Sequence, residues 1–588
     1  MDPFVLRLFL PVSIAILIGA IDDLIVDALW LWSWVKRRLQ PEADPFPPGQ
    51  RQLALAPKQR IAILIPLWQE DRVIGRMLEQ TLAAVRYSHY EIFAGCYPND
   101  TATQEVIREV AARHPQVHLA LCPHDGPTSK ADCLNSIYRY LALHEEMSGN
   151  TFDVIVTHDA EDMVHPDELK WVNYYTSRYD FLQMPVLPIA SPKHQLLHGL
   201  YCDEFAEYHT RDMRVRAGMA FVPGAGVGTA IRRDALDELT RSGHDIFEPG
   251  ALTEDYCNGY RMYALGCNQA FPPIARTAEG TFLATREYFP MKWRAALRQR
   301  TRWVTGIVLQ GMEQVGWRGG IGAKYWLWRD RKGLLGNPLS LLANALFVYA
   351  LATGAWRHLP ATVERLAWAT MAAMVVRCAV RIGCSARYYG LPFALLSPLR
   401  TILGNLLNSA ASVCAIAHYS WCKLRGRPLR WLKTSHQYPD RGELLQQRRR
   451  LGEILVESGE LQATQLDHAL AACPPQVRLG EYLTAAKQVT EETVYRALSI
   501  QQGMPLLAND ATAIRTLPRD FARSHRVLPF RIAERTLHLA TPEPPAHSTI
   551  TAIAGHTTLE LRFYLVPPSV FERKFATLVT CSRDTSRS

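Results

Sequence analysis

The sequence contains no closely spaced pair of cysteines and no Walker A phosphate-binding motif. Its 12 cysteines are scattered over 588 residues without a C-x-x-C pair, which excludes a zinc ribbon and gives no support for a disulfide framework. The soluble parts are therefore predicted to lie in a reducing compartment such as the cytosol. The absence of G-x-x-x-x-G-K-[ST] excludes an ATPase of the P-loop class.

Charged residues are also scarce. They make up 21% of the chain against 48% apolar residues, a composition that excludes a disordered or fibrous protein. The formal charge of +9 is mild for this length, and basic flanks of membrane segments explain it as well as a nucleic-acid partner does. A mean hydropathy of −0.09 is too polar for a protein made mostly of membrane spans. We therefore expect three or four units, with soluble domains attached to a few apolar segments.

The first apolar segment predicts a membrane span. It runs from Phe4 to about Ile21, continues to Trp34 and is followed at once by Lys36–Arg38. A signal peptide carries its positive charge before the apolar run, so the order found here favours a span with its C-terminal end in the cytoplasm. Three aspartates within the segment are expected to face protein or the membrane interface: Asp22, Asp23 and Asp27. A buried helix of a soluble domain is the alternative interpretation.

Apolar density returns between residues 337 and 422. Pro338–Trp356 and Leu366–Gly383 are each long enough to span a membrane, while polar residues within Leu391–Trp421 favour an interfacial or re-entrant helix. The predicted organisation is an N-terminal transmembrane helix with its flank (1–40), a linker (41–59), an α/β domain (60–335), transmembrane and interfacial helices (336–425), a linker (426–443) and a mostly helical α+β domain (444–588).

Short β-rich runs alternate with helical patterns from Arg60 to about Lys332. The runs are Ile61–Pro66, Glu91–Cys96, Val117–Leu121 and Val154–Thr157. This alternation predicts a largely parallel, Rossmann-like sheet covered by helices. Ligands bind beyond the carboxyl ends of the strands in such sheets, so polar residues after those ends are candidates for a binding site.

Three such candidates follow the first three strands. Glu70 and Asp100 could accept hydrogen bonds from a nucleoside, although a turn cap is the alternative role of Asp100. Lys130 lies where a loop enters a helix and could meet a phosphate as a point charge, with a solvated helix start as the alternative.

An acidic cluster follows the fourth strand, in His158-Asp159-Ala160-Glu161-Asp162. Carboxylates this close repel one another unless a cation lies among them, and Mg²⁺ or Mn²⁺ takes oxygen ligands from protein and phosphate. We interpret Asp159 and Glu161 as a clamp for a metal-bound diphosphate. Asp162 is the alternative second acid, because three acids in four positions do not all point inward.

Two later motifs supply groups for a transfer reaction. Thr253-Glu254-Asp255-Tyr256 offers a carboxylate that could deprotonate an attacking hydroxyl as a general base. In the helical pattern of Gln299-Arg300-Thr301-Arg302-Trp303, the second arginine could neutralise a leaving diphosphate and the tryptophan could stack on a sugar. A basic interfacial helix with an anchoring tryptophan is the alternative interpretation.

In this order the motifs resemble the family-2 glycosyltransferases of the GT-A fold, inverting enzymes that use UDP-sugars and include membrane-embedded polysaccharide synthases. The resemblance covers about residues 60–330 and departs from the family in having D-A-E-D in place of D-x-D. It implies uridine recognition by Glu70 and Asp100, donor-site lining by Lys130 and Asp132, metal–diphosphate binding by Asp159 and Glu161, a base at Asp255 beside Glu254, and an acceptor border of Gln299, Arg302 and Trp303.

The C-terminal part contains a tandem repeat. Arg450–Leu455 recurs as Arg478–Leu483, an offset of 478 − 450 = 28 residues. The repeat resembles the MshEN domain, in which paired motifs bind cyclic di-GMP through arginines and leucines. The positions that keep this pattern are Arg450, Leu451, Gly452, Leu455, Gly459, Leu466, Leu470, Arg478, Leu479, Gly480, Leu483, Leu498 and Gln501. Cys473 replaces a glutamine and Lys487 a glycine of that pattern, so a docking surface without nucleotide is the alternative.

Further motifs extend a resemblance over nearly the whole chain to bacteriophage-adsorption inner-membrane proteins of the NfrB type; they include Y-P-N-D-T, G-A-G-V-G-T and W-R-D-R-K-G. That family joins such a transferase to a C-terminal domain and works with an outer-membrane partner in making and exporting an exopolysaccharide. The resemblance implies an N-acetylhexosamine donor.

The leading hypothesis is a multi-pass polysaccharide synthase of the bacterial inner membrane, with its catalytic and C-terminal domains in the cytoplasm. It would be a hexosyltransferase that moves a sugar from a UDP-sugar to a polysaccharide acceptor under control by cyclic di-GMP, with no nucleic-acid partner. The alternatives are a single-addition transferase acting on a lipid-linked acceptor, and an inactive membrane scaffold for export or phage adsorption.

Overall fold

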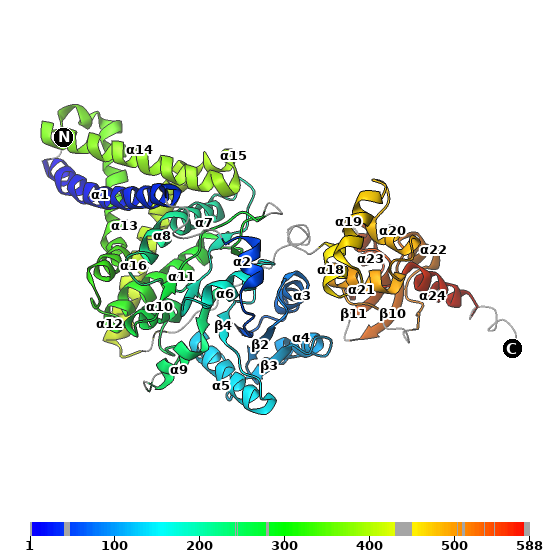
Figure 1. The fold of residues 1–588 in the computed structure, drawn as a ribbon. Coiled ribbons are helices and arrows are strands. Elements are labelled where there is room, and N and C mark those ends of the chain that lie inside the picture. The colour runs from blue at the N-terminus through cyan, green and yellow to red at the C-terminus, as the bar shows by residue number, and fades with distance from the viewer. Residues whose placement is uncertain are drawn as a thin grey trace. The chain divides into compact units, whose positions relative to one another are not determined.

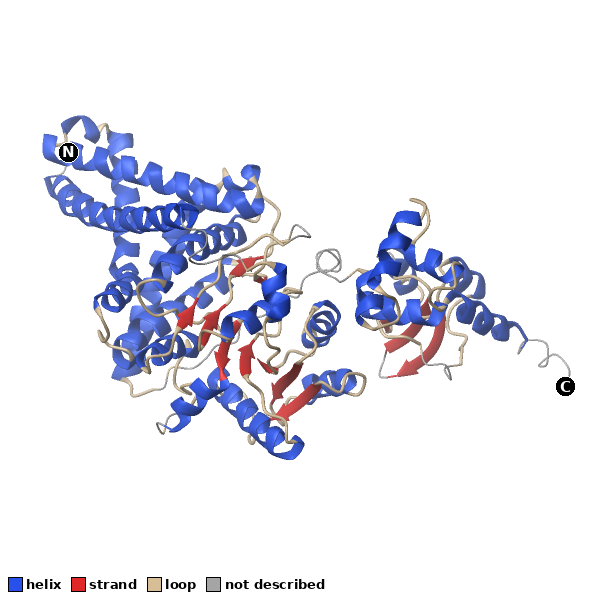
Figure 2. Ribbon diagram, viewed as in Figure 1, coloured by secondary structure: helices blue, strands red, loops and turns tan. Residues whose placement is uncertain are grey.

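A computed structural model describes residues 3–39, 48–427, 429 and 450–580, except 242, 244, 278–280, 503, 508–511, 534–535 and 546. The predicted linkers lie partly (41–59) or mostly (426–443) outside these residues. The chain divides into two compact units, one of residues 1–78 and 85–439 and the other of residues 440–588 with 79–84. Each unit is described by itself (Figures 1 and 2).

The first unit is built around a seven-stranded sheet with the order β3-β2-β1-β4-β7-β5-β8. The four predicted strands are present as β1 (Ile61–Pro66), β2 (Tyr90–Cys96), β3 (Val117–Leu121) and β4 (Val154–Thr157), and they pair in parallel. β7 (Thr229–Arg232) is antiparallel to both of its neighbours, which makes the sheet mixed. The remaining strands are β5 (Phe181–Gln183), β8 (Gln269–Ala270), and the separate pair β6 (Val186–Pro188) and β9 (Thr285–Glu287).

Helices cover the sheet because β1 is buried on both faces. Leu64 packs with Phe93 of β2 and with Ile137 of a long helix, α5 (Lys130–Ser148). Ser129 caps the start of α5 by accepting a hydrogen bond from the backbone N–H of Asp132 at 3.2 Å. The other helices of this domain are α2 (Gln50–Leu55), α3 (Ile74–Ala84), α4 (Thr101–Ala111), α6 (Glu168–Thr176), α7 (Leu196–Glu207), η1 (Tyr208–Asp212), α8 (Met213–Ala217), α9 (Arg233–Arg241), α10 (Glu254–Ala264), α11 (Trp293–Trp303), η2 (Val304–Gln310) and α12 (Gly311–Gln314).

Four helices are long and apolar enough to cross a membrane: α1 (Pro3–Leu39), α13 (Ile321–Thr353), α14 (Ala361–Tyr389) and α16 (Ser397–Leu424). The predicted spans after residue 337 fall within α13 and α14, which are joined by η3 (Ala355–His358). α16 follows α15 (Leu391–Ala394) and packs on α7, α11 and α13, with 39% of its apolar window buried in the protein. Its placement as an interfacial helix stays a prediction.

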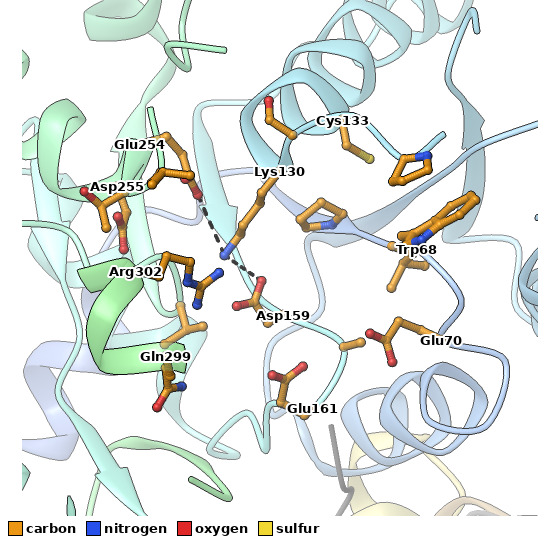
Figure 3. A pocket seen from close by; sticks show the side chains of 18 of the residues that line it. Trp68, Glu70, Lys130, Cys133, Asp159, Glu161, Glu254, Asp255, Gln299 and Arg302 are labelled. Carbon is orange, nitrogen blue, oxygen red and sulfur yellow. Dashed lines mark ion pairs between the residues drawn. The ribbon is translucent and has the colours of Figure 1, made fainter. Parts of the chain in front are cut away.

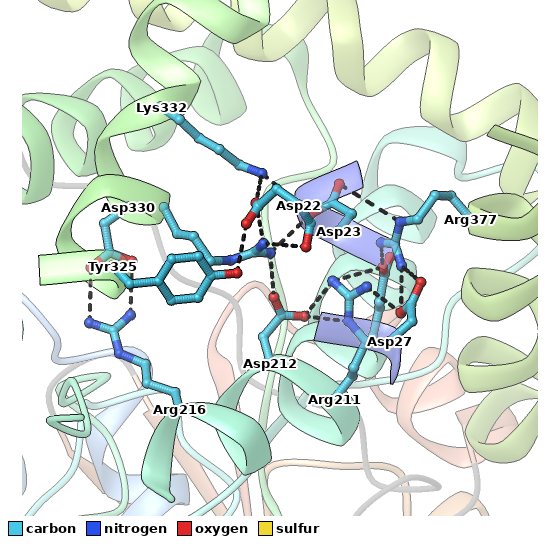
Figure 4. Close-up of polar contacts among 12 residues, drawn as sticks. Asp22, Asp23, Asp27, Arg211, Asp212, Arg216, Tyr325, Asp330, Lys332 and Arg377 are labelled. Carbon is cyan, nitrogen blue, oxygen red and sulfur yellow. Dashed lines mark hydrogen bonds and ion pairs between the residues drawn. The ribbon is translucent and has the colours of Figure 1, made fainter. Parts of the chain in front are cut away.

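The three aspartates of α1 face protein, as their sequence context predicts. Asp22 accepts hydrogen bonds from Tyr325 at 2.6 Å and from Lys332 at 2.5 Å, both on α13. Asp27 pairs with Arg211 of η1 at 2.6 Å and with Arg377 of α14 at 2.9 Å. This network therefore joins α1, α13 and α14 to the α/β domain (Figure 4).

The second unit contains four short helices followed by a small sheet. The helices α18 (Leu451–Glu457), α19 (Ala463–Ala472), α20 (Leu479–Ala485) and α21 (Glu491–Gln502) correspond to the tandem repeat. The remaining elements are α22 (Arg519–Ser524), β10 (Leu528–Ala533), β11 (Thr536–Thr541), α23 (His547–Ala554), β12 (Glu560–Leu565) and α24 (Pro568–Thr580), with the strand order β10-β11-β12.

The two copies of the repeat share backbone geometry as well as sequence. Arg450 and Arg478 each precede a helix with an extended backbone. Gly459 ends the first copy with a φ of 76°, and Lys487, 28 residues later, has a φ of 54° in the same left-handed region. The lysine that replaces the expected glycine therefore keeps the turn, in a conformation that disfavours residues with a Cβ.

Candidate active site

A pocket opens where the strands of the parallel part of the sheet end. It is lined by nine of the predicted residues: Glu70, Lys130, Asp159, Glu161, Glu254, Asp255, Gln299, Arg302 and Trp303 (Figure 3). They come from loops after β1 and β4 and from α5, α10 and α11, so the fold brings together motifs that are up to 233 residues apart, from 70 to 303. The predicted residues Asp100 and Asp132 are outside this lining.

Lys130 lies at the centre of the pocket. Its ammonium is 2.6 Å from Asp159 and 3.9 Å from Glu254, and it donates a hydrogen bond to the carbonyl of Gly226 at 3.4 Å. Burial alone would lower the pKa of Lys130, but the surrounding carboxylates outweigh burial and raise it above its usual value. The lysine is therefore a fixed positive charge beside Asp159.

The acidic loop after β4 is anchored from behind by a buried histidine. His158 Nδ1 lies 2.8 Å from Asp162, and its Nε2 lies 2.9 Å from Glu168 on α6. Burial alone would lower the pKa of His158, yet these two carboxylates raise it to about 10. Asp162 also accepts a hydrogen bond from the backbone N–H of Asp159 at 3.0 Å. Asp162 is thus used within the loop, and the geometry favours Glu161 as the second acid facing the pocket.

Glu287 is a pocket residue that sequence reasoning missed. It lies at the end of β9 and lines the pocket opposite the acidic loop. Burial, together with the charges of Asp162, Glu161 and Asp159, raises the pKa of Glu287 well above its usual range. Three carboxyl groups around one space form the oxygen donor set that a hard divalent cation prefers, so the residues present fit Mg²⁺ or Mn²⁺.

Glu254 and Asp255 begin α10 and are packed against a glycine-rich loop. A Cβ added at Gly226 would lie 2.9 Å from the Lys130 ammonium and 3.1 Å from the Asp255 carboxylate, and its φ of 78° also requires glycine. Burial raises the pKa of Asp255, against the lowering effects of Lys130 and Arg302. Burial likewise raises the pKa of Glu254, to about 7. Carboxyl groups with raised pKa values in a cleft are suited to act as general bases near neutral pH.

The last turns of α11 form another wall. Gln299, Arg302 and Trp303 line the pocket, and Trp303 packs edge-on against Tyr201 with ring centres 6.1 Å apart. Arg300 points elsewhere and binds Glu204 of α7 at 2.5 Å and Asn408 of α16 at 3.0 Å. One arginine of this motif is therefore structural, while the other faces the pocket.

Aromatic side chains form the remaining end of the pocket. Trp68 and Tyr97 meet edge to face at 5.4 Å, and the hydroxyl of Tyr97 lies 2.7 Å from that of Thr128. Neither ring was singled out in the sequence, although each follows a strand end directly. Glu70 lines this end of the pocket together with these rings.

The two remaining predicted donor residues have local partners. Asp100 caps α4 and accepts a hydrogen bond from the backbone N–H of Gln69 at 2.5 Å. Asp132 accepts a hydrogen bond from Thr128 at 2.6 Å and lies 3.3 Å from His124. Both support the loops around the aromatic end of the pocket, and their contact with a donor stays a prediction.

The predicted nucleotide-binding residues of the second unit divide into two groups. Leu455 and Leu483 are fully buried in the core between the repeats, and a Cβ at Gly452 or Gly480 would lie 2.4 Å from Leu466 or 2.8 Å from Val494. These positions serve the packing of the helices. The exposed positions are Arg450, Gly459, Leu470 and Arg478, and the half-buried ones are Leu451, Leu466, Leu479, Leu498 and Gln501.

Comparison with family models agrees with this division. Residues 57–306 match the family described as "Glycosyltransferase like family 2", and residues 503–579 match the MshEN domain. The tandem repeat lies directly before the second match.

Solved structures give weaker likenesses. The mannosyltransferase PcManGT from Pyrobaculum calidifontis, in complex with GDP-Man and Mn²⁺, is 15% identical with a TM-score of 0.43, over 69% of this chain and all but 1% of that chain (99%). The structure of MshE with cdg is 26% identical with a TM-score of 0.20, over 22% of this chain and 99% of that chain.

Two curated proteins resemble nearly the whole chain. Bacteriophage adsorption protein B of Escherichia coli (strain K12) and bacteriophage N4 adsorption protein B of Escherichia coli O157:H7 are each 33% identical over 591 aligned positions, which cover 94% of this chain and 79% of the relative. The chain therefore belongs to the bacteriophage adsorption protein B family, as a membrane protein with a family-2 glycosyltransferase domain and a C-terminal MshEN domain.

Proposed function

We propose that this protein is an inverting hexosyltransferase that extends an exopolysaccharide at the bacterial inner membrane, with a UDP-sugar as donor. The observation that best supports the proposal is the pocket in which Lys130, Asp159, Asp255 and Arg302 meet. A scaffold without activity has no need of this arrangement. An N-acetylhexosamine donor is the specific form of the proposal, and the catalytic and C-terminal domains would be cytoplasmic.

The donor would lie along the pocket from its aromatic end to α10. The base would stack near Trp68 and Tyr97, close to Glu70, while Lys130 and Arg302 would contact the diphosphate. Asp159 and Glu161 would hold Mg²⁺ or Mn²⁺, with Glu287 adjacent, and the bound ion would neutralise charge on the diphosphate. Trp303 and Gln299 would border the acceptor sugar.

Asp255 would act as the general base. Its buried carboxylate would take the proton of the acceptor hydroxyl as that oxygen attacks the anomeric carbon of the donor. The bond to the diphosphate breaks on the opposite face, so the configuration at that carbon is inverted. Arg302 and Lys130 would stabilise the negative charge on the departing nucleotide.

A donor screen on membranes containing the full chain tests this function. UDP-N-acetylhexosamines with Mg²⁺ or Mn²⁺ should give a radiolabelled polymer, and Asp255→Asn membranes should give none above background. A single labelled sugar on a lipid would instead identify a transferase of the single-addition type. No transfer from any nucleotide sugar, with retained support of phage adsorption, would identify a scaffold.

We further propose that cyclic di-GMP controls transfer through the repeat of the second unit. Arg450 and Arg478 are exposed at equivalent positions of two similar copies, and cyclic di-GMP has two equivalent halves. A ligand switches an enzyme only through unequal affinity for its states, and a coupling of typical size would give about 5–150-fold activation.

Titration of full-chain membranes with cyclic di-GMP tests this control. Arg450→Ala or Arg478→Ala should remove the stimulation and keep the basal rate, whereas the exposed Arg496→Ala of α21 should keep both. Equal stimulation of all variants would rule out the repeat as the binding site. An outer-membrane partner for export belongs to the same proposal and would be recovered by cross-linking in intact cells.

A further inference from the structure

A second cavity lies at the C-terminal ends of α1 and α14, and it shares no lining residue with the catalytic pocket. Its volume is about 440 Å³, and its walls come from α1, η1, α8, the segment Pro273–Arg276 and α14. Five arginines line it: Arg37, Arg38, Arg214, Arg276 and Arg387. Among the described residues that line this cavity there is no carboxylate. Arginines gathered in this way repel one another, and an anion between them would relieve that repulsion.

Aromatic rings hold two of these arginines at the cavity. The guanidinium of Arg38 lies 4.9 Å from the centre of the Trp34 ring, and that of Arg387 lies 5.5 Å from the Tyr388 ring. The Tyr388 hydroxyl is 2.8 Å from that of Thr210 on η1. The cavity thus combines cationic groups with apolar walls and a hydroxyl pair.

The cavity lies at the level where α1 leaves a bilayer. The exposed side of α1 is an apolar stripe that runs from Leu10 through Ile18 and Ile25 to Trp32. Tryptophans followed by Lys36–Arg38 are typical of a cytoplasmic headgroup region.

α14 runs parallel to α1 and ends beside it (Figure 1). Val12 packs in one cluster with Val363, and Asp27 pairs with Arg377 about one helix length later on both helices. The C-terminal ends of the two helices therefore reach the same depth, and Arg387 lies near the headgroups as well.

We propose that this cavity binds the phosphate of an anionic phospholipid from the cytoplasmic leaflet. Guanidinium groups match phosphate oxygens with paired hydrogen bonds, and basic pockets between membrane helices bind anionic headgroups in this way. The tryptophans would contact the glycerol and upper acyl chains. The lipid would bridge α1 and α14 to the glycosyltransferase domain, since Thr210 and Arg214 belong to that domain.

Native mass spectrometry of the full chain in neutral detergent tests the proposal. The probes are short-chain phosphatidylglycerol, short-chain phosphatidylcholine and inorganic phosphate. Phosphatidylglycerol should bind at least about tenfold more tightly than phosphatidylcholine, and the double variant Arg38→Gln/Arg387→Gln should bind it about 30-fold more weakly than the wild type. Both side chains are exposed, so the variant keeps its fold.

Arg365→Gln is the matched control, because Arg365 is also exposed on α14 but lies near its other end. It should bind phosphatidylglycerol like the wild type. Equal binding of phosphatidylglycerol by the wild type and the double variant would overturn the proposal. Inorganic phosphate bound as tightly as the lipid, and lost in the same variant, would assign the cavity to a soluble phosphate and overturn the lipid assignment.

Discussion

The ion-pair network around α1 and the catalytic pocket hold similar numbers of charged side chains, but the charges balance only in the first. In the network, five carboxylates meet five cations: Asp22, Asp23, Asp27, Glu207 and Asp212 against Arg211, Arg329, Lys332, Arg377 and Arg381. In the pocket, six carboxylates face two cations: Glu70, Asp159, Glu161, Glu254, Asp255 and Glu287 against Lys130 and Arg302. The balanced cluster holds helices together, whereas the unbalanced one leaves room for a metal ion and for bases (Figures 3 and 4).

Removing one acid of the unbalanced cluster should have the largest effect. Asp159→Ala should weaken donor binding in Mg²⁺ or Mn²⁺ on the order of a thousandfold, because the diphosphate would reach the protein mainly through the ion. Isothermal titration with the UDP-sugar measures this, and excess EDTA should reproduce the result with the wild-type protein. Asp234→Ala, an exposed position on α9, is the control. Full transfer in excess EDTA would contradict a metal clamp.

The proposed base should matter for transfer but little for binding. Asp255→Asn should lower the transfer rate by about a hundredfold to ten-thousandfold while the affinity for the UDP-sugar stays near that of the wild type. The measurement is initial rate against donor affinity on the same purified preparation. A near-normal rate in this variant would mean that another acid, such as Glu254, takes the proton.

The balanced cluster should respond in stability instead of chemistry. Asp22→Asn would leave Arg329 and Lys332 with too little negative charge and should reduce the free energy of unfolding by about 3–5 kcal/mol. Thermal melts in detergent measure the change, with Glu364→Gln on the exposed side of α14 as the control. A double-mutant cycle with Arg329→Gln should show strong coupling. Unchanged melting of Asp22→Asn would mean that the network contributes nothing to the docking of α1.

A pH profile should give the smallest and most graded effect. The pKa values of Asp255 and Glu254 are raised by burial, the latter to about 7, and a base must be ionised to accept a proton. The transfer rate should therefore rise with pH up to about 7 and fall about tenfold per pH unit below it. The residual rate of Asp255→Asn should lack this slope. A flat profile between pH 5 and 8, with donor binding constant over the range, would argue against a buried base.

Much of the site could be predicted because parallel strands end at one edge. Glu70, Lys130 and Asp159 follow different strands, and the topology of the sheet alone brings them together. Asp255 and Arg302 were identified by their motifs, since no spacing rule connects α10 and α11 to the sheet. The antiparallel β7 was not predicted, because a four-residue strand has no feature that gives its direction.

The missed residues depend on contacts between distant segments. Glu287 reaches the pocket because β9 pairs with β6 and because Arg286 bridges to Met163, and neither pairing leaves a pattern in the sequence. The role of His158 depends on Glu168, ten residues later on a different element. In the same way, the choice between Glu161 and Asp162 required the direction of each side chain, which three acids in four positions do not reveal.

The π-helix η2, which begins directly after Trp303, has a consequence for helical phase. A π-helix takes more residues per turn than an α-helix, so residues before and after it are rotated relative to a continuous α-helix. Gly306 within η2 lies close to Thr253, and a Cβ there would lie 2.5 Å from the threonine hydroxyl. Deleting one residue of 304–310 would favour an ordinary α-helix and turn Arg302 by about 100° about the helix axis relative to α12. The direction in which Arg302 and Trp303 point is thus set by one surplus residue in the next turn of the chain.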